Sequence, residues 1–179
     1  MSRLIPLLLS AAFLMAGCAL IRPAPELLLL PPAEGPAPVL LKQTLAMESR
    51  GERLQFLVVG RFDHQSSRLA ALMATGQPLM TLEYDGRKLR QQVNIPAELP
   101  GKAILATIQF ALWPADALSR YYPSEAGWRL DMEASRRRLW HDGVPQLDVV
   151  HEGGVIRVTN YPGEYSVTIQ TLEKRKLAQ

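Results

Sequence analysis

Apolar and polar residues alternate with a period of two along most of the chain after residue 38. Between residues 39 and 59 this pattern predominates on both sides of the turn sequence Arg50-Gly51-Glu52, which predicts a β-hairpin. The same alternation returns in shorter runs that are separated by turn sequences. These further predicted strands are 69–74, 79–84, 87–95, 128–132, 138–140, 147–151, 155–160 and 165–171. We expect about nine strands, and their short connections require antiparallel pairing.

The dipeptide Asp85-Gly86 separates two of these runs. Asp-Gly between alternating strands is a strong hairpin signal, because a tight two-residue turn needs positive φ at both central positions. We therefore expect such a turn at Asp85-Gly86.

The middle of the chain has a helical pattern instead. Pro96 to Gly101 breaks the strands, and Pro114 ends a first helix over residues 102–112 and begins a second, which Pro123 stops. The first helix carries one apolar stripe, formed by Ile104, Leu105, Ile108 and Leu112. The expected buried side of the second helix consists of Ala115, Leu118, Tyr121 and Tyr122.

The order of these elements predicts a mainly β fold with a helical insertion, in the α+β class. Both the apolar face of the sheet and the apolar stripe of the helix must be buried, and one domain has one place for both. We expect a curved antiparallel sheet, or half-open β-barrel, with residues 102–122 as a helical lid over its concave face. The chain of 179 residues then contains a single domain over residues 39–179.

The N-terminus has the features of an export signal. Arg3 precedes the apolar run Leu4 to Met15, which is too short to span a bilayer, and the single cysteine of the chain follows it as Cys18. The stretch Leu14-Met15-Ala16-Gly17-Cys18 resembles the bacterial lipobox. The resemblance implies that residues 1–17 are a signal peptide and that Cys18 carries lipid. The alternative is an ordinary signal peptide followed by an unrelated buried cysteine.

Residues 18–38 are rich in proline, alanine and leucine, and we interpret them as a semi-rigid tether. The run Leu27–Leu30 within it either packs on the domain or touches the bilayer. Ala19 follows the cysteine, and lipoproteins with alanine there, unlike those with aspartate, go to the outer membrane. We expect the chain on the periplasmic face of that membrane.

The sequence offers little catalytic chemistry, and we expect no enzyme activity, no cofactor and no metal. His64, His141 and His151 have no second histidine or carboxylate at ligand spacing, and no nucleophile elbow or phosphate loop occurs. A formal net charge of +3 is too small to indicate nucleic-acid binding. The run Arg136-Arg137-Arg138 either meets anionic headgroups or is a solvated strand edge. The three tryptophans line a cavity or belong to the core: Trp113, Trp128 and Trp140.

Two segments and the helices that follow them resemble the periplasmic lipoprotein carrier LolA and its receptor LolB. The segments are Gly76-Gln77-Pro78-Leu79 and Leu82-x-Tyr84-Asp85-Gly86. Those proteins are half-open β-barrels whose apolar concavity, covered by helices, holds acyl chains. The resemblance implies the same arrangement here.

The chain also resembles an uncharacterised proteobacterial lipoprotein family, a domain of unknown function, over nearly all of the mature region. The matching segments are Ile108-Gln109-x-x-Leu112-Trp113-Pro114, Arg138-Leu139 and Tyr165-x-Val167-x-Ile169-Gln170-Thr171-Leu172. Some relatives are encoded in aryl-polyene gene clusters beside acyl-chain enzymes, a LolA-like carrier and an exporter. This implies a role in transporting or assembling an aryl-polyene lipid or a similar molecule, with such a carrier or exporter as partner.

Two hypotheses follow. The first is a lipid-binding receptor or chaperone whose sheet encloses an apolar cavity, and the second is a structural or partner-binding lipoprotein with a filled core. The residues that would line a cavity and those that would fill a core are of the same types, so the sequence does not distinguish the two hypotheses. The expected ligand-binding residues are Phe56, Val58, Leu82, Tyr84, Ile104, Ile108, Leu112, Trp113, Val167 and Ile169.

The lipobox-like stretch generates a first testable prediction. Replacing Cys18 with serine removes the thiol that would accept the lipid, so Cys18→Ser is expected to leave the membrane fraction and to lose processing at residue 18. Cell fractionation with immunoblotting measures both. A variant that stays membrane-bound and is cleaved at the same place would contradict the lipid anchor.

Overall fold

The fold is built on one antiparallel sheet, in which β5 and β6 are the two unpaired edges. The computed structural model describes residues 25–96 and 99–178, so Cys18 and the expected signal peptide lie outside the described residues. The described strands are β1 (Val39–Ser49), β2 (Glu52–Phe62), β3 (Ser67–Met73), β4 (Pro78–Tyr84), β5 (Leu89–Val93), β6 (Trp128–Met132), β7 (Arg136–His141), β8 (Val144–Glu152), β9 (Val155–Asn160) and β10 (Tyr165–Lys176). Their order across the sheet is β5-β4-β3-β2-β1-β10-β9-β8-β7-β6, ten strands where the alternation predicted about nine.

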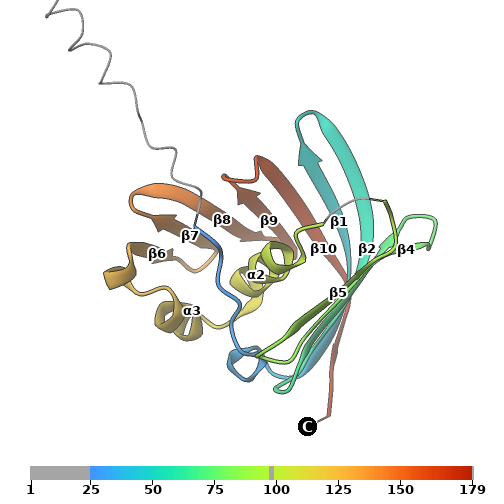
Figure 1. Cartoon of the computed structure of the whole chain (residues 1–179), viewed down its shortest axis with the longest axis horizontal. Helices are drawn as coiled ribbons and strands as arrows, with labels where there is room; N and C mark the ends of the chain where they lie inside the picture. Colours follow the sequence, from blue (N-terminus) through green and yellow to red (C-terminus); the bar gives the residue numbers. More distant parts are fainter. Residues whose placement is uncertain (1–24, 97–98, 179) are drawn as a thin grey trace, which may run out of the picture.

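Two helices and two short 3-10 helices complete the described chain. They are η2 (Pro32–Glu34), α2 (Gly101–Leu112), α3 (Ala115–Tyr121) and η3 (Ser124–Ala126). The sheet is strongly curved and does not close, and both α-helices lie on its concave side (Figure 1). The predicted curved antiparallel sheet with a helical insertion is therefore the architecture of the chain.

Tight turns with left-handed backbone connect several strands, but not at the expected dipeptide. Positive φ at both central positions occurs at Arg50 and Gly51 (50° and 82°) and at Asp142 and Gly143 (49° and 78°). At Asp85-Gly86 only the glycine has positive φ. There the Asp85 carboxylate accepts hydrogen bonds from the backbone N–H groups of Arg87 and Lys88, which makes a longer turn. The predicted hairpin is present, since β4 pairs with β5 on either side of this turn, but the expected positive φ at both Asp85 and Gly86 was wrong.

The curvature has local causes in the strands. The pairing register shifts in β1 between Lys42 and Gln43, in β3 between Ala71 and Leu72, and in β7 between Leu139 and Trp140. An extra residue in one strand bends it and increases its twist. These irregularities let one continuous sheet wrap around the two helices.

The helices bury only some of the predicted residues, namely Leu105, Leu118 and Tyr122. In α2 the core side consists of Leu105, Gln109 and Phe110, each 0% exposed, whereas Ile104, Ile108 and Leu112 are only half-buried. In α3 the buried residues are Ala117 and Leu118, and Ala115 is exposed. The fully buried face of α2 is therefore displaced by about one residue around the helix from the predicted apolar stripe.

The residues before β1 lie against the helices as a strap, residues 25–38 (Figure 1). Leu30 is fully buried, and its backbone N–H donates to Gln109 Oε1 while its carbonyl accepts from Gln109 Nε2, both at 2.8 Å. Tyr122 makes a similar pair with the backbone of Leu28, and burial raises the pKa of Tyr122 to about 12, so its hydroxyl stays protonated. The Leu27–Leu30 run therefore packs on the domain.

The Gln109 bonds generate a second prediction. Gln109→Met keeps the side-chain length but leaves the buried N–H and C=O of Leu30 without partners, at a cost of about 2–4 kcal/mol in the free energy of unfolding. Urea unfolding followed by circular dichroism measures the loss. Gln92→Met on the exposed face of β5 is the matched control, expected within about 0.5 kcal/mol of the parent. Equal stabilities for the two variants would contradict the proposed bond pair.

Candidate functional site

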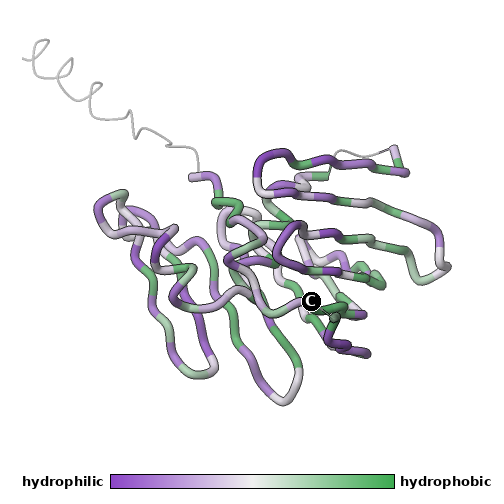
Figure 2. The backbone as a smooth tube through the Cα atoms, turned by 90° about the horizontal axis from the view of Figure 1, so that it is seen from below, coloured by the Kyte–Doolittle hydropathy of each residue, from purple (hydrophilic) through white to green (hydrophobic). Residues whose placement is uncertain are grey.

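An apolar surface lies on the concave face of the sheet, beside the part that the helices cover. Neighbouring strands place its side chains in register: Leu45 is opposite Phe56 and Ile169, Met47 is opposite Leu54 and Val167, and Phe56 is opposite Met73. We call this surface the trough; it consists of Leu45, Met47, Leu54, Phe56, Met73 and Val167. Apolar residues coloured green on these strands are visible in Figure 2.

The trough is open to solvent. Leu54 is 46% and Met73 is 39% exposed, and the other four side chains are half-buried. Exposed apolar residues of this size on adjacent strands form a continuous patch, which in soluble domains marks a binding surface more often than chance. The trough is therefore the strongest candidate site on the apolar face.

Helix α2 forms the wall beside the trough. Its half-buried side chains Ile108 and Leu112 face Val58 and Ile169 of the sheet across a space of ≈ 10 Å³, about the volume of one water molecule. The other residues around this space are Gln43, Leu45, Ala111 and Ile156. Beneath the helix the core is thus nearly filled, whereas the trough beside it is uncovered.

The structure divides the ten predicted ligand-binding residues into two groups. Five are buried in the core: Val58, Leu82, Tyr84, Trp113 and Ile169. Five are half-buried, in the trough or on its helical wall: Phe56, Val167, Ile104, Ile108 and Leu112. Sequence reasoning missed Leu45, Met47, Leu54 and Met73, although their period-two alternation with Phe56 and Val167 placed them on the same face.

The tryptophans have different environments. Trp113 is fully buried, with its ring edge-on to Phe62 at 5.5 Å, and Trp128 is buried against Tyr122. Trp140 lies half-buried on the convex face, where the guanidinium of Arg129 stacks 3.9 Å from its ring centroid. Trp113 and Trp128 therefore belong to the core, and Trp140 belongs to neither the core nor a cavity.

The arginine run lies in β7, an interior strand, and each of its members has partners within the protein. Arg137 donates from Nη1 to the carbonyl oxygens of Phe110 at 2.9 Å and Trp113 at 2.8 Å, at the C-terminal end of α2. Arg136 pairs with Asp148, and Arg138 pairs with Glu133. Burial lowers the pKa of Arg137, but a guanidinium remains charged and stabilises the negative end of the helix dipole. The run therefore does not lie at an edge of the sheet, although the side chains of Arg136 and Arg138 are 43% and 32% exposed.

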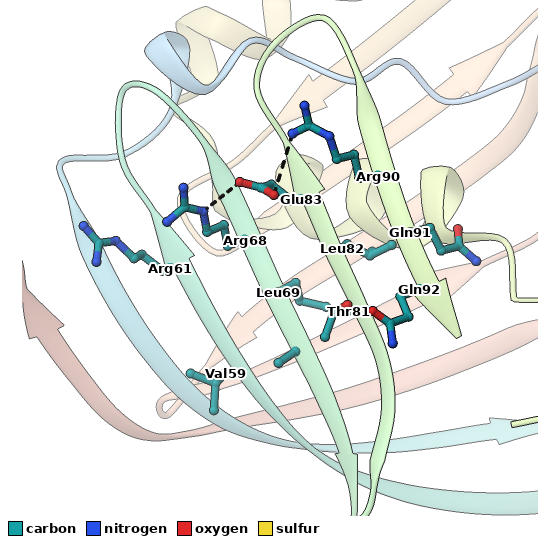
Figure 3. A pocket seen from close by; sticks show the side chains of 11 residues that line it. Val59, Arg61, Arg68, Leu69, Thr81, Leu82, Glu83, Arg90, Gln91 and Gln92 are labelled. Carbon is teal, nitrogen blue, oxygen red and sulfur yellow. Dashed lines mark hydrogen bonds and ion pairs between the residues drawn. The ribbon is translucent and has the colours of Figure 1, made fainter. Parts of the chain in front are cut away.

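A larger hollow of ≈ 600 Å³ lies on the opposite, convex face over β2–β5 (Figure 3). Arg61, Arg68, Glu83 and Arg90 line it, and Glu83 pairs with both Arg68 and Arg90. The hollow therefore combines three guanidinium groups and one carboxylate with an apolar lining from Val59, Leu69, Ala70 and Leu82. It does not share residues with the trough.

No three histidine, cysteine, aspartate or glutamate side chains in the described ranges lie close enough to hold a metal ion. In the same ranges, no helix has the length and apolar character needed to cross a membrane.

Fold and site together define an open, curved antiparallel sheet with helices on its concave face and an uncovered apolar trough. A family of proteins of unknown function (DUF3261) matches residues 40–173, from β1 to β10. The chain belongs to this family. No curated protein matches the chain.

The position of Arg137 generates a third prediction. Arg137→Met removes two charge-assisted hydrogen bonds from the buried end of α2, at a cost of about 2–4 kcal/mol in the free energy of unfolding. Arg138→Met is the matched control, because its surface ion pair contributes about 1 kcal/mol or less. Chemical denaturation of both variants measures the difference. If the two substitutions cost the same, Arg137 does not fasten α2 to the sheet.

Proposed function

We propose that the chain is a lipid-anchored lipoprotein on the periplasmic face of the outer membrane that binds or hands over a hydrophobic, lipid-like ligand. The observation that carries this proposal is the trough: six apolar side chains, aligned in register on four adjacent strands, of which Leu54 and Met73 are exposed and the other four half-buried. An acyl or polyene chain is the ligand class that such a surface fits. The ligand in this proposal is an aryl-polyene lipid or the acyl chains of a lipoprotein.

The energetics favour an elongated apolar ligand. Each Å² of apolar surface removed from water contributes about 25 cal/mol to binding. A hydrogen bond to a polar headgroup contributes little, because it replaces a hydrogen bond that the headgroup already makes to water. The side chains that form the trough present no charged group, so the trough supplies burial rather than directional hydrogen bonds. This is the usual composition of a site for long hydrocarbon chains.

The helical wall is held in place rather than free to swing. Arg137 fastens the C-terminal end of α2 to β7, and Gln109 fastens its middle to the strap. A movement of the predicted lid as a unit requires these four hydrogen bonds to break together. We therefore propose that a ligand first occupies the trough and reaches the Ile104–Ile108–Leu112 side by small displacements of these half-buried side chains.

The open sheet and its helices support the proposed likeness to LolA and LolB. An incomplete barrel with helices on the concave side and apolar residues at its opening supports a carrier or receptor role. In this proposal the partner is a periplasmic LolA-like carrier or an exporter, and the chain catalyses no reaction.

One observation favours the second candidate function, a structural or partner-binding lipoprotein. The space of ≈ 10 Å³ between α2 and the sheet is too small for any part of an acyl chain. In that case the trough is covered by a partner protein instead of a lipid. Direct ligand binding distinguishes the two functions.

The trough generates a fourth prediction. Leu54→Glu places a charge on a largely exposed trough position, so folding is expected to be unchanged within about 0.5 kcal/mol. Burying that charge beside a hydrocarbon chain is expected to weaken binding about tenfold, which corresponds to about 1.4 kcal/mol. Titration of the full chain with a fluorescent fatty acid measures the affinity.

Val144→Glu is the matched control, because Val144 is an exposed apolar residue of β8 outside the trough. It is expected to bind the fatty acid as the parent does. A folded parent protein that binds no fatty acid would reject the lipid-binding function and leave the partner-binding one.

A further inference from the structure

The exposed large apolar side chains are concentrated at one end of the sheet. Antiparallel pairing brings together at this end the turns after β1, β3, β7 and β9, since Ser49 lies opposite both Glu52 and Tyr165, and Leu147 lies opposite Asn160. We call this end the upper rim: residues 49–54, 73–78, 141–144 and 160–165. The β1–β2 and β9–β10 hairpins of the rim stand at the top of Figure 1.

Among the described residues, six large apolar side chains are exposed, and four of them belong to the upper rim. These four are Leu54, Met73, Val144 and Tyr161, from 39% to 58% exposed. A fifth, Leu28, lies in the strap three residues from where the described chain begins, and only Leu172 lies elsewhere, along β10. Loops on one side of a soluble domain are ordinarily polar, so this concentration indicates contact with an apolar phase.

The described chain also begins at this rim. Pro25, Glu26 and Leu27 line a groove of ≈ 550 Å³ together with Pro162 and Gly163 of the β9–β10 turn. The remaining lining residues include Leu99 to Ala103 at the start of α2. Pro25, the first described residue, therefore lies beside the upper rim.

Chain length then decides which end of the domain can reach the membrane. Six residues separate Cys18 from Pro25, so the seven Cα-to-Cα steps between them span at most about 25 Å when fully extended. The opposite end of the sheet is farther from the upper rim, because the 11 residues of β1 alone rise about 35 Å. An anchor at Cys18 brings the upper rim within reach of the bilayer and excludes an upright orientation in which only the opposite end faces the bilayer.

We propose that the upper rim is a membrane-docking surface that rests on the bilayer in which the protein is anchored, so that the trough opens at the membrane. This rests on the proposed function for the lipid anchor at Cys18. Leu54 and Met73 belong both to the rim and to the trough, so a hydrocarbon chain passes between the bilayer and the trough without crossing water.

The contact is apolar rather than electrostatic. Both arginines of the rim are paired with a carboxylate, Arg50 with Glu164 of the rim and Arg53 with Glu48 of β1 beside it, each at 3.6 Å. Surface attraction to anionic headgroups needs an excess of cations, which these pairs do not provide. The docking is therefore expected on zwitterionic lipid and to be insensitive to salt.

Fluorescence quenching tests the orientation. Full-length protein carrying Leu54→Cys or Tyr161→Cys is labelled with a fluorophore and reconstituted into phosphatidylcholine vesicles whose acyl chains carry nitroxide quenchers. His64→Cys and Lys88→Cys, at exposed turns of the opposite end, are the matched controls. The parent chain, whose single cysteine is Cys18, shows how much of the signal comes from fluorophore attached to Cys18. The rim labels are expected to be quenched severalfold more than the controls, in low and in high salt.

Equal quenching at both ends, stronger quenching at His64 and Lys88, or protein that does not stay with the vesicles would overturn the docking surface. Fatty-acid binding by the same preparations separates this result from the fate of the proposed function. Binding without rim quenching rejects only the orientation, whereas rim quenching without binding retains the docking surface and rejects the lipid-binding trough.

Discussion

One buried amide holds the concave side of this protein together. Gln109 gives both hydrogen bonds that the backbone of Leu30 needs, and so joins the strap before β1 to the middle of α2. A buried backbone group without a partner costs free energy comparable to a lost hydrogen bond, so strap and helix are stable in this position only together. Arg137 adds the second fixed point, at the C-terminal end of the same helix.

The uncovered trough is a consequence of this fastening. A helix of 12 residues is about 18 Å long, whereas strands β1, β2 and β10 have 11 or 12 residues and extend well beyond it. Held by Gln109 and Arg137, α2 cannot slide along the strands to cover the remaining apolar residues. Apolar surface that a fixed helix leaves exposed is available to a ligand, a partner or a membrane.

Much of the fold follows from residue patterns. Period-two alternation predicted the strands and their antiparallel pairing, and Pro114 correctly separated two helices. The sequence did not predict the orientation of α2. The spacing of Ile104, Ile108 and Leu112 shows that they share one face of the helix, but not which element packs against that face. Gln109 is a polar residue that the sequence alone places at the surface, and its burial depends on hydrogen bonds to Leu30 of the strap, 79 residues away. In the same way, the charge of Arg137 predicted exposure, whereas two helix carbonyls hold it inside.

The central claim is that the trough holds a hydrocarbon chain, and lipid mass spectrometry tests it most directly. The full chain, purified without added lipid, is expected to release an acyl- or polyene-containing molecule at close to one per protein. The same preparation of Leu54→Glu is expected to carry much less of that molecule. A folded parent protein that carries no such molecule, or a variant that carries the same amount, would contradict the account.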